Sequence, residues 1–294
     1  MAVAVAGQAP PSPEPTARVL AGAIDIHVHS LPDNVDRSVD GVEAALMARA
    51  RGMRAIVLKN HYDQTASLAF IVRRLVPDIG VFGGVDLNLP VGGMNPAAVE
   101  HMTQVTGSYG RFVWMSTFDA ENQVRYSKEN RPFVSVAKNG ALLPETKAVI
   151  ATIAKHPQLV LATGHTAADE GLMMLREGRQ QGAHHMVVTH AINPPILMDL
   201  PRMQEAARLG AFIEFVGSSM LLPDAPERVA RIADAIRKIG PEFCILSSDL
   251  GQKTNPVPAE GFAAFILALK AKGFSDADLD LMSKENPARL LDLR

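Results

Sequence analysis

The sequence predicts an α/β protein, a single-domain (β/α)8 or TIM barrel, on three observations. Eight short apolar runs alternate along the chain with eight longer amphipathic runs, the order expected of parallel strands joined by helices. The chain has 294 residues, and barrels of about 250 residues commonly form one domain. The segment that ends the first run reads HVHSLPDN, without the glycine-rich phosphate loop of an open, doubly wound sheet.

The predicted strands are short runs rich in β-branched and other apolar residues, which favour extended structure. The first of them reads AIDIHVHS, and several others also end in polar or titratable residues. The eight predicted strands are residues 23–30, 55–61, 80–88, 112–118, 159–166, 185–192, 211–217 and 243–249.

The predicted helices lie between the strands and carry recognisable ends. Gly52 follows the first helix and Pro77 follows the second, and both residue types commonly stand where a helix stops. Pro96 lies in the first turn of the third helix, where proline is favoured. The eight predicted helices are residues 38–50, 65–76, 95–105, 144–155, 167–180, 199–209, 226–239 and 259–272.

Two segments fall outside this alternation. Residues 1–22 are rich in Pro and Ala, so we expect a mobile N-terminal arm before a barrel that occupies residues 23–294. Residues 119–143, after the fourth strand, are polar and longer than an ordinary connection. They form either a surface excursion or a lid at the face where barrels place their active sites.

Composition narrows the class of protein. Hydrophobic residues make up 47% of the chain and charged residues 20%, with a formal net charge of −2, which is typical of a soluble globular protein. We expect no nucleic-acid partner, because no basic stripe is present, and no membrane span, because no long uncharged apolar run is present. Cys244 is the single cysteine, which fits a reducing cytoplasm. The oligomeric state is open, and a homo-oligomer is compatible with the sequence.

His27 and His29 carry the strongest chemical signal, because they lie two residues apart at the end of the first strand. Strand residues two apart point to the same side, so the two imidazoles face inward together. Two neutral imidazoles held in this way can bind one divalent ion. The alternative is a pair of hydrogen-bonded core histidines.

Three further residues stand at predicted strand ends: His165, His190 and Asp249. In a barrel the carboxyl ends of all strands meet at one mouth. Nitrogen and oxygen ligands of this kind suit zinc first, with manganese, iron or nickel as alternatives. We therefore expect one or two divalent ions, which would lower the pKa of bound water from 15.7 to about 7 and make hydrolysis accessible at neutral pH.

This pattern of HxH followed by His, His and Asp at later strand ends resembles the amidohydrolase superfamily. The resemblance covers residues 23–294, and the segment ENPARLL at residues 285–291 is similar to the superfamily's closing helix. Within the superfamily, the stretch GMRAIVLKNH at residues 52–61 resembles a poorly characterised amidohydrolase-like family.

The resemblance implies a role for each of these residues. His27 and His29 would bind the first and more buried metal. His165 and His190 would bind a second metal, or one of them would position the substrate if a single ion is present. Asp249 would bind metal and exchange a proton with the attacking water.

The sequence departs from the binuclear members, which bridge their metals with a carboxylated lysine on the fourth strand. That strand here reads RFVWMSTF, and Lys59 lies on the second strand instead. Lys59 is a carboxylated bridging ligand, an ammonium that holds a substrate anion, or a lysine that extends to solvent. His61 contacts substrate, adds a metal ligand or makes a local hydrogen bond.

Two carboxylates are weaker candidates. Glu214 in the middle of the seventh strand needs a partner if it is buried, and either orients a ligand histidine or pairs with a structural cation. Asp25 precedes His27 by two residues and is a candidate support for the first-strand site.

The leading functional hypothesis is a hydrolase that cleaves an amide, cyclic amide, lactone or ester bond in a small molecule, with Asp249, Lys59 and His61 as catalytic candidates. A non-oxidative decarboxylase, a lyase with one metal and a cationic Lys59, is the second hypothesis. A catalytically inactive metal-binding barrel is the third.

Overall fold

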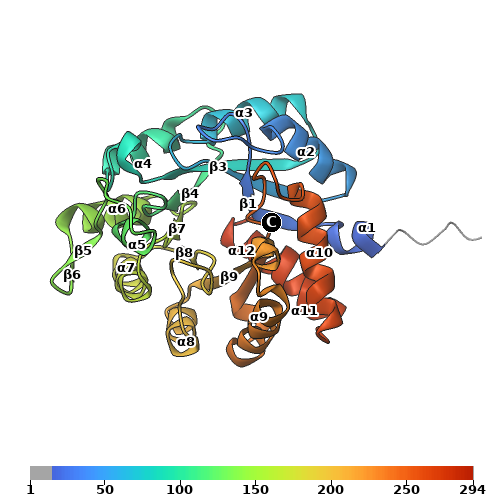
Figure 1. The fold of residues 1–294 in the computed structure, drawn as a ribbon. Helices are drawn as coiled ribbons and strands as arrows, with labels where there is room; N and C mark the ends of the chain where they lie inside the picture. The colour runs from blue at the N-terminus through green and yellow to red at the C-terminus, as the bar shows by residue number, and fades with distance from the viewer. Residues whose placement is uncertain (1–14, 294) are drawn as a thin grey trace, which may run out of the picture.

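Eight parallel strands curve into a barrel in the computed structural model of the chain, which describes residues 15–293 (Figure 1). The strands follow each other around the sheet in chain order, so each connection moves one place along. All eight predicted strands are present, with ends that differ by a few residues. They are β1 (Ile24–His29), β2 (Ala55–Lys59), β3 (Gly80–Asp86), β4 (Gly110–Trp114), β7 (Val160–Ala162), β8 (His185–Val188), β9 (Phe212–Val216) and β10 (Cys244–Ser247).

The barrel closes between its first and last strands just beyond the end of β10. Val28 and Leu250 form an isolated parallel bridge. The Asp249 N–H donates to the His27 carbonyl at 2.9 Å, and the His29 N–H donates to the Leu250 carbonyl at 2.8 Å. Gly251 follows with a φ of 124°, and a Cβ there would lie 1.9 Å from the His29 carbonyl oxygen, so only glycine fits. We call this contact the seam.

An outer layer of helices surrounds the strands (Figure 1), as alternating connections in a parallel barrel require. The eight predicted helices are all present. Their bounds are α2 (Gly41–Ala50), α3 (Ala66–Leu75), α4 (Pro96–Gln104), α6 (Pro144–Lys155), α7 (Ala168–Gln181), α8 (Leu200–Arg208), α9 (Ala225–Ile239) and α10 (Pro258–Ala271). Short 3-10 turns lie at η1 (Leu89–Val91), η2 (Gly217–Leu221) and η3 (Pro241–Phe243).

Two apolar clusters stabilise this arrangement. The larger lies between the strands and the helices, and the smaller fills the barrel interior, with Trp114 and Phe112 stacked at 4.8 Å between ring centroids. The chain ends in α11 (Asp276–Asp280), η4 (Leu281–Glu285) and α12 (Asn286–Leu290). Leu290 and Leu291 join the interior cluster. The predicted closing segment therefore covers the end of the barrel opposite the predicted mouth.

The described segments outside the repeat contain secondary structure of their own. The predicted mobile arm over residues 1–22 lies mostly outside the described residues, but its last part forms α1 (Pro15–Leu20), which packs against α10. Leu20 is fully buried there. Residues 119–143 fold as α5 (Glu121–Tyr126) and a small hairpin of β5 (Ala137–Lys138) and β6 (Ala141–Leu142).

No helix within residues 15–293 has the length and apolar character needed to cross a membrane.

Candidate metal centre

A β-bulge in β1 sets the direction of the first two histidines. Between Asp25 and Val28, β1 has three steps where β2 has two, so one extra residue is accommodated. Asp25 Oδ1 holds this kink by accepting hydrogen bonds from the N–H groups of His27 at 3.1 Å and Ser248 at 2.9 Å. Val28 therefore packs in the outer core, whereas His27 and His29 both face the barrel interior.

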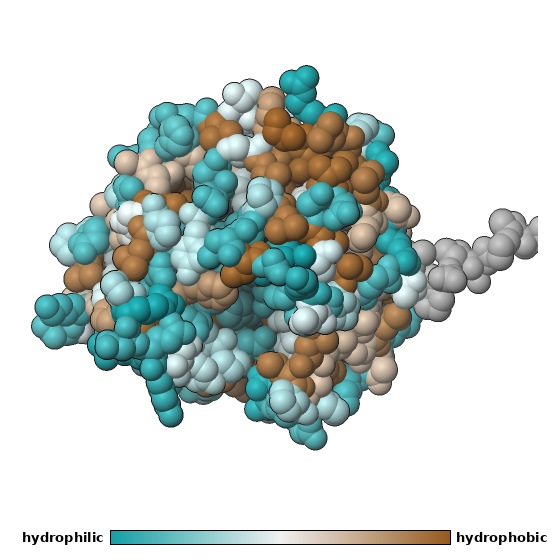
Figure 2. Space-filling model, turned by 45° about the horizontal axis from the view of Figure 1, so that its top comes forward, coloured by the Kyte–Doolittle hydropathy of each residue, from teal (hydrophilic) through white to brown (hydrophobic). Residues whose placement is uncertain are grey.

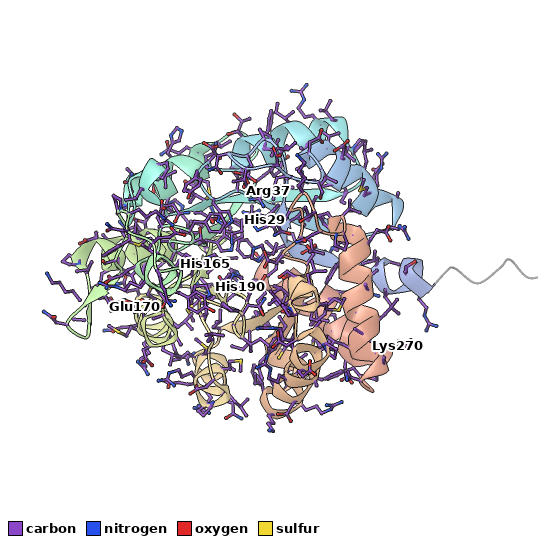
Figure 3. The ribbon with its side chains drawn as sticks, in the orientation of Figure 1. His29, Arg37, His165, Glu170, His190 and Lys270 are labelled. Atoms are coloured by element: carbon purple, nitrogen blue, oxygen red, sulfur yellow. The ribbon has the colours of Figure 1, made fainter. Side chains whose placement is uncertain are left out.

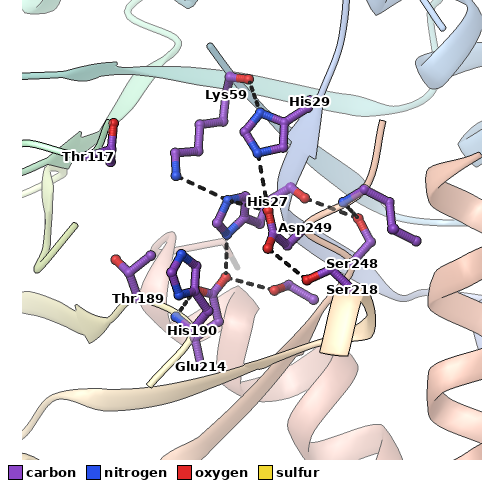
Figure 4. A network of polar contacts seen from close by, with 12 residues as sticks. His27, His29, Lys59, Thr117, Thr189, His190, Glu214, Ser218, Ser248 and Asp249 are labelled. Atoms are coloured by element: carbon purple, nitrogen blue, oxygen red, sulfur yellow. Dashed lines mark hydrogen bonds and ion pairs between the residues drawn. The ribbon is translucent and has the colours of Figure 1, made fainter. Parts of the chain in front are cut away.

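His27, His29 and Asp249 form a compact group whose candidate ligand atoms all lie within 4.8 Å of one another. Asp249 Oδ1 lies 3.2 Å from Nε2 of His27 and 3.2 Å from Nε2 of His29. The two histidines are buried, and Asp249 reaches them from the far side of the seam with a φ of 50° (Figure 4). Residues far apart in the sequence thus meet as the strand-end pattern predicted.

The groups behind the two rings fix which nitrogen faces the group. His29 Nδ1 lies 3.0 Å from the Lys59 carbonyl oxygen, which can only accept, so Nδ1 carries the proton. His27 Nδ1 lies 3.0 Å from Glu214 Oε1 and donates in the same way. Burial lowers the pKa of His29 to about 3, although the adjacent Asp249 carboxylate acts in the opposite direction, so this ring is neutral at pH 7. The Nε2 atom of His29 therefore presents a lone pair, and Nε2 of His27 faces Asp249 Oδ1 and Lys59 Nζ.

This arrangement fits a cation. Nε2 of His29 and Oδ1 of Asp249 both accept hydrogen bonds, yet they lie 3.2 Å apart. Burial opposes the charge of Asp249, but the adjacent His27 and His29 hold the pKa of its carboxyl well below the usual range. A lone pair of His29 and a partly buried carboxylate oxygen thus converge without a shared hydrogen, beside Nε2 of His27, and this set of side chains suits a divalent metal ion.

His165 and His190 form a second pair, with their Nε2 atoms 3.1 Å apart. His165 Nδ1 donates to Gln123 Oε1 at 2.9 Å, which again leaves Nε2 free to accept. His190 Nδ1 is buried and has no hydrogen-bond partner among the described residues. Burial lowers the pKa of His190 to about 4 and that of His165 well below its usual range. Two neutral imidazoles so placed can hold a second ion or a substrate oxygen.

Lys59 lies between the two histidine pairs with no exposed surface, so the alternative in which it extends to solvent is wrong. Its Nζ lies 3.1 Å from His27 Nε2, 3.9 Å from Asp86 Oδ2 and 5.1 Å from the centroid of the Trp114 ring. Lys59 fits into the core because a carboxylate and an aromatic face both stabilise a cation there.

His61 lies in the wall of the site, stacked on Phe118 with ring centroids 3.6 Å apart. Its Nδ1 donates to Thr117 Oγ1 at 2.9 Å, and that hydroxyl donates in turn to Asp86 Oδ2 at 2.8 Å. Burial and the nearby Lys59 charge lower the pKa of His61 well below its usual range. A local hydrogen bond is therefore present, and the other ring nitrogen stays available to a ligand.

Glu214 and Asp25, the two weaker candidates, both accept hydrogen bonds from His27. Glu214 accepts from His27 Nδ1 and from Ser247 Oγ at 2.7 Å through one oxygen, and from the His190 N–H at 2.8 Å through the other. Burial opposes its ionisation, but the adjacent His27 and His190 and their hydrogen bonds lower its pKa overall. Glu214 thus joins the two histidine pairs.

The sequence interpretation missed Asp86 and Gln123. Asp86 is the last residue of β3, just as Asp249 follows the end of β10. Its position at a strand end could therefore have identified it from the sequence. Burial raises its pKa to about 6, with the Lys59 charge acting against that shift, and its Oδ1 has no hydrogen-bond partner within the described part of the chain. Gln123 lies on α5 in the long loop, where no spacing rule indicates which side chain turns inward.

A cavity of about 240 Å³ opens onto these side chains. Figure 2 shows a hollow near the centre of the face in view, lined by hydrophilic side chains. Figure 3 places Arg37, His29, His165 and His190 around the barrel mouth. The cavity is lined by His29, Arg37, Lys59, His61, Phe118, Gln123, His165, His190, Asn193, Pro194, Asp249 and Gln252.

Comparison with known proteins gives a family and a fold. A family model described as "Family of unknown function (DUF6282)" matches residues 22–214. No curated protein sequence matches the chain.

Three solved structures share the fold at low sequence identity. The phosphotriesterase homology protein from Escherichia coli, complexed with phosphate in its active site, is 19% identical with a TM-score of 0.62, over 92% of this chain and 99% of that one. An amidohydrolase from Burkholderia multivorans with bound zinc is 15% identical with a TM-score of 0.65, over 93% and 100%. The 2,6-dihydroxybenzoate decarboxylase from Rhizobium is 14% identical with a TM-score of 0.57, over 93% and 99%. The predicted resemblance to amidohydrolases is thus confirmed at the level of the fold.

Proposed function

The chain belongs to a protein family of unknown function, DUF6282, so its activity has to be inferred from its own site. We propose that it is a metal-dependent hydrolase that cleaves an amide, cyclic amide, lactone or ester bond in a small molecule. The supporting observation is the meeting of His27, His29 and Asp249 as three acceptors inside a barrel mouth that opens onto a cavity.

The metal ion and the side chains around it would have different roles in hydrolysis. A divalent ion held by His27, His29 and Asp249 would supply a water of lowered pKa and a positive charge for the scissile oxygen. Asp249 stays ionised at neutral pH, so its carboxylate can take a proton from the attacking water and pass it to the leaving group. Ser218 Oγ donates to Asp249 Oδ2 at 2.8 Å and holds the carboxylate in this orientation.

We propose zinc as the first ion, since two imidazoles and a carboxylate suit it and the fold neighbour from Burkholderia multivorans binds zinc. His165 and His190 would hold a second ion when one is present, and otherwise a substrate oxygen. Manganese, iron and nickel share this ligand preference, so the ion has to be identified by elemental analysis.

The chemical state of Lys59 determines how the two histidine pairs act together. Asp86 and the Trp114 ring both stabilise a cation, which favours an ammonium that faces the substrate. A carboxylated Lys59 that bridges two ions is the alternative. NMR of protein equilibrated with isotope-labelled bicarbonate separates the two, because only the carbamate gives a new carbonyl resonance.

The buried cation at Lys59 also favours a second candidate function, a non-oxidative decarboxylase. An ammonium in the barrel mouth could hold the carboxylate of an acid substrate, and one fold neighbour is a decarboxylase. Release of carbon dioxide from an acid by a protein with one ion per chain would establish this function in place of hydrolysis.

The proposal is tested by metal content and turnover together. We expect wild-type protein to retain about one zinc ion or more per chain after dialysis, and His27→Ala to lose both the ion and all hydrolysis of a panel of lactones, amides and esters. His101→Ala, an exposed histidine on α4, is the control and should change neither. Unchanged metal stoichiometry in His27→Ala, measured by plasma emission, would contradict the proposed site.

A further inference from the structure

Arg37 is a buried cation in the wall of the cavity that the proposed hydrolysis does not use. It lies in the loop between β1 and α2, and its side chain is only 3% exposed. It lines the same cavity as Lys59, His61 and Asp249. Burying a guanidinium costs free energy of folding unless its N–H groups are hydrogen-bonded.

Asp33, four residues earlier in the chain, anchors one edge of the guanidinium. Arg37 Nε donates to Asp33 Oδ2 at 2.7 Å. Nη2 lies 2.5 Å from the same oxygen as an ion pair, and this buried atom makes no hydrogen bond within residues 15–293. Asp33 therefore fixes the side chain through Nε without satisfying the hydrogen-bonding capacity of the whole guanidinium.

The backbone holds this loop rigidly beside the seam. Arg37 and Gln252 form an antiparallel bridge, and the Ser38 N–H donates to the Gly251 carbonyl at 2.8 Å. The charge of the guanidinium also affects the electrostatics of the site. Burial is the main cause of the lowered pKa values of His29 and His61, and the positive charge of Arg37 lowers both further.

We propose that Arg37 binds a carboxylate of the substrate, so that the enzyme acts on a small acid whose scissile bond lies beside Asp249. The fork of a guanidinium matches the two oxygens of a carboxylate, and Arg37 lines the cavity together with Asp249. Asp33 already balances one positive charge, which favours a singly charged carboxylate over a phosphate dianion. This inference rests on the proposed function for the reaction, but not for the binding step.

The test measures binding without turnover. Acetate, butyrate and benzoate are titrated by calorimetry into zinc-loaded and metal-free protein, each beside its neutral amide. We expect at least one acid to bind wild type about tenfold or more tightly than its amide, the effect of losing one charge-assisted contact. Arg37→Gln should abolish this preference in metal-free protein, where no zinc ion can bind the carboxylate directly. The matched control is Arg228→Gln. This substitution removes a guanidinium on α9 that pairs with Asp224 four residues earlier, the same spacing as Asp33 and Arg37, and it should change nothing.

A second variant guards against loss of the fold. Arg37→Lys keeps the charge opposite Asp33 but lacks the fork, so it should fold with the melting temperature of wild type and still lose most of the preference. The proposal is overturned if wild type shows no preference for any acid, if the preference survives in metal-free Arg37→Gln, or if Arg37→Lys retains it fully. Failure of the hydrolase proposal would instead appear as absent metal or absent turnover, with the Arg37-dependent binding intact.

Discussion

His27, His29 and His165 each present Nε2 to the site because a neighbour has already bonded Nδ1. Glu214, the Lys59 carbonyl and Gln123 accept from His27, His29 and His165 respectively. These acceptors fix the tautomers before any ion arrives. Preorganised acceptors of this kind raise metal affinity because little rotamer freedom remains to be lost on binding.

Asp249→Asn separates metal binding from proton transfer. The amide keeps an oxygen that can reach the ion but cannot take up a proton at neutral pH. We expect partial retention of zinc and a loss of turnover of about 10²–10⁴-fold. Steady-state kinetics and plasma emission on the same samples measure both, and turnover close to wild type would rule out the proton-transfer role.

The histidines and Asp249 at the strand ends could be predicted from the sequence, because their position follows from strand period and barrel topology alone. The same reasoning applies to Asp86, which the sequence interpretation missed. Gln123 and Arg37 could not be predicted, because each lies in a loop whose path depends on tertiary contacts. For Arg37 those contacts are the bridge to Gln252 and the ion pair with Asp33, and no spacing in the sequence encodes them.

At the scale of elements, the bulge in β1 shows how a strand serves two requirements. Strict alternation would place Ile26 and His27 on opposite faces, yet Ile26 belongs to the interior cluster and His27 lies in the site above it. The extra residue lets the apolar interior of the barrel lie directly below the candidate metal centre. The sequence predicted that His27 and His29 share a face, but not the bulge, since no glycine marks it.

Asp25 is expected to maintain this bulge. Burial raises its pKa to about 7, against its hydrogen bonds from Ser248 and His27, so an uncharged side chain suits the position near neutral pH. Asp25→Ala removes the acceptor of two buried N–H groups and should lower the free energy of unfolding by about 2–4 kcal/mol. Asp25→Asn keeps one oxygen acceptor and should cost less.

Urea denaturation of the two Asp25 variants at one pH measures the difference, and zinc content reports whether the histidines moved. Equal stability of Asp25→Ala and Asp25→Asn would show that the two hydrogen bonds do not hold the bulge.

For the whole molecule, the alternation of eight strands and eight helices was enough to predict the architecture, because hydrophobic periodicity survives in each element. The ends were less predictable. The segment that forms α1 reads as a Pro- and Ala-rich arm, and only its packing against α10 turns Leu20 into a core residue.

Cys244 provides a probe of the intact barrel. Its side chain is buried on β10, and burial raises the pKa of its thiol far above the usual range. Thiolate is the reactive form, so modification requires the barrel to open. We expect a thiol reagent to label native protein about 10³-fold or more slowly than denatured protein. Comparable rates in the two states would mean that β10 separates from its neighbours without global unfolding.

The seam has a consequence for biosynthesis. His29 and Asp249 lie 220 residues apart in the chain, so a nascent polypeptide carries its first two imidazoles long before their carboxylate partner has been translated. Tight capture of an ion must then wait until the final strand has left the ribosome and docked beside the first. Metal loading would in this way report that a complete barrel has been made.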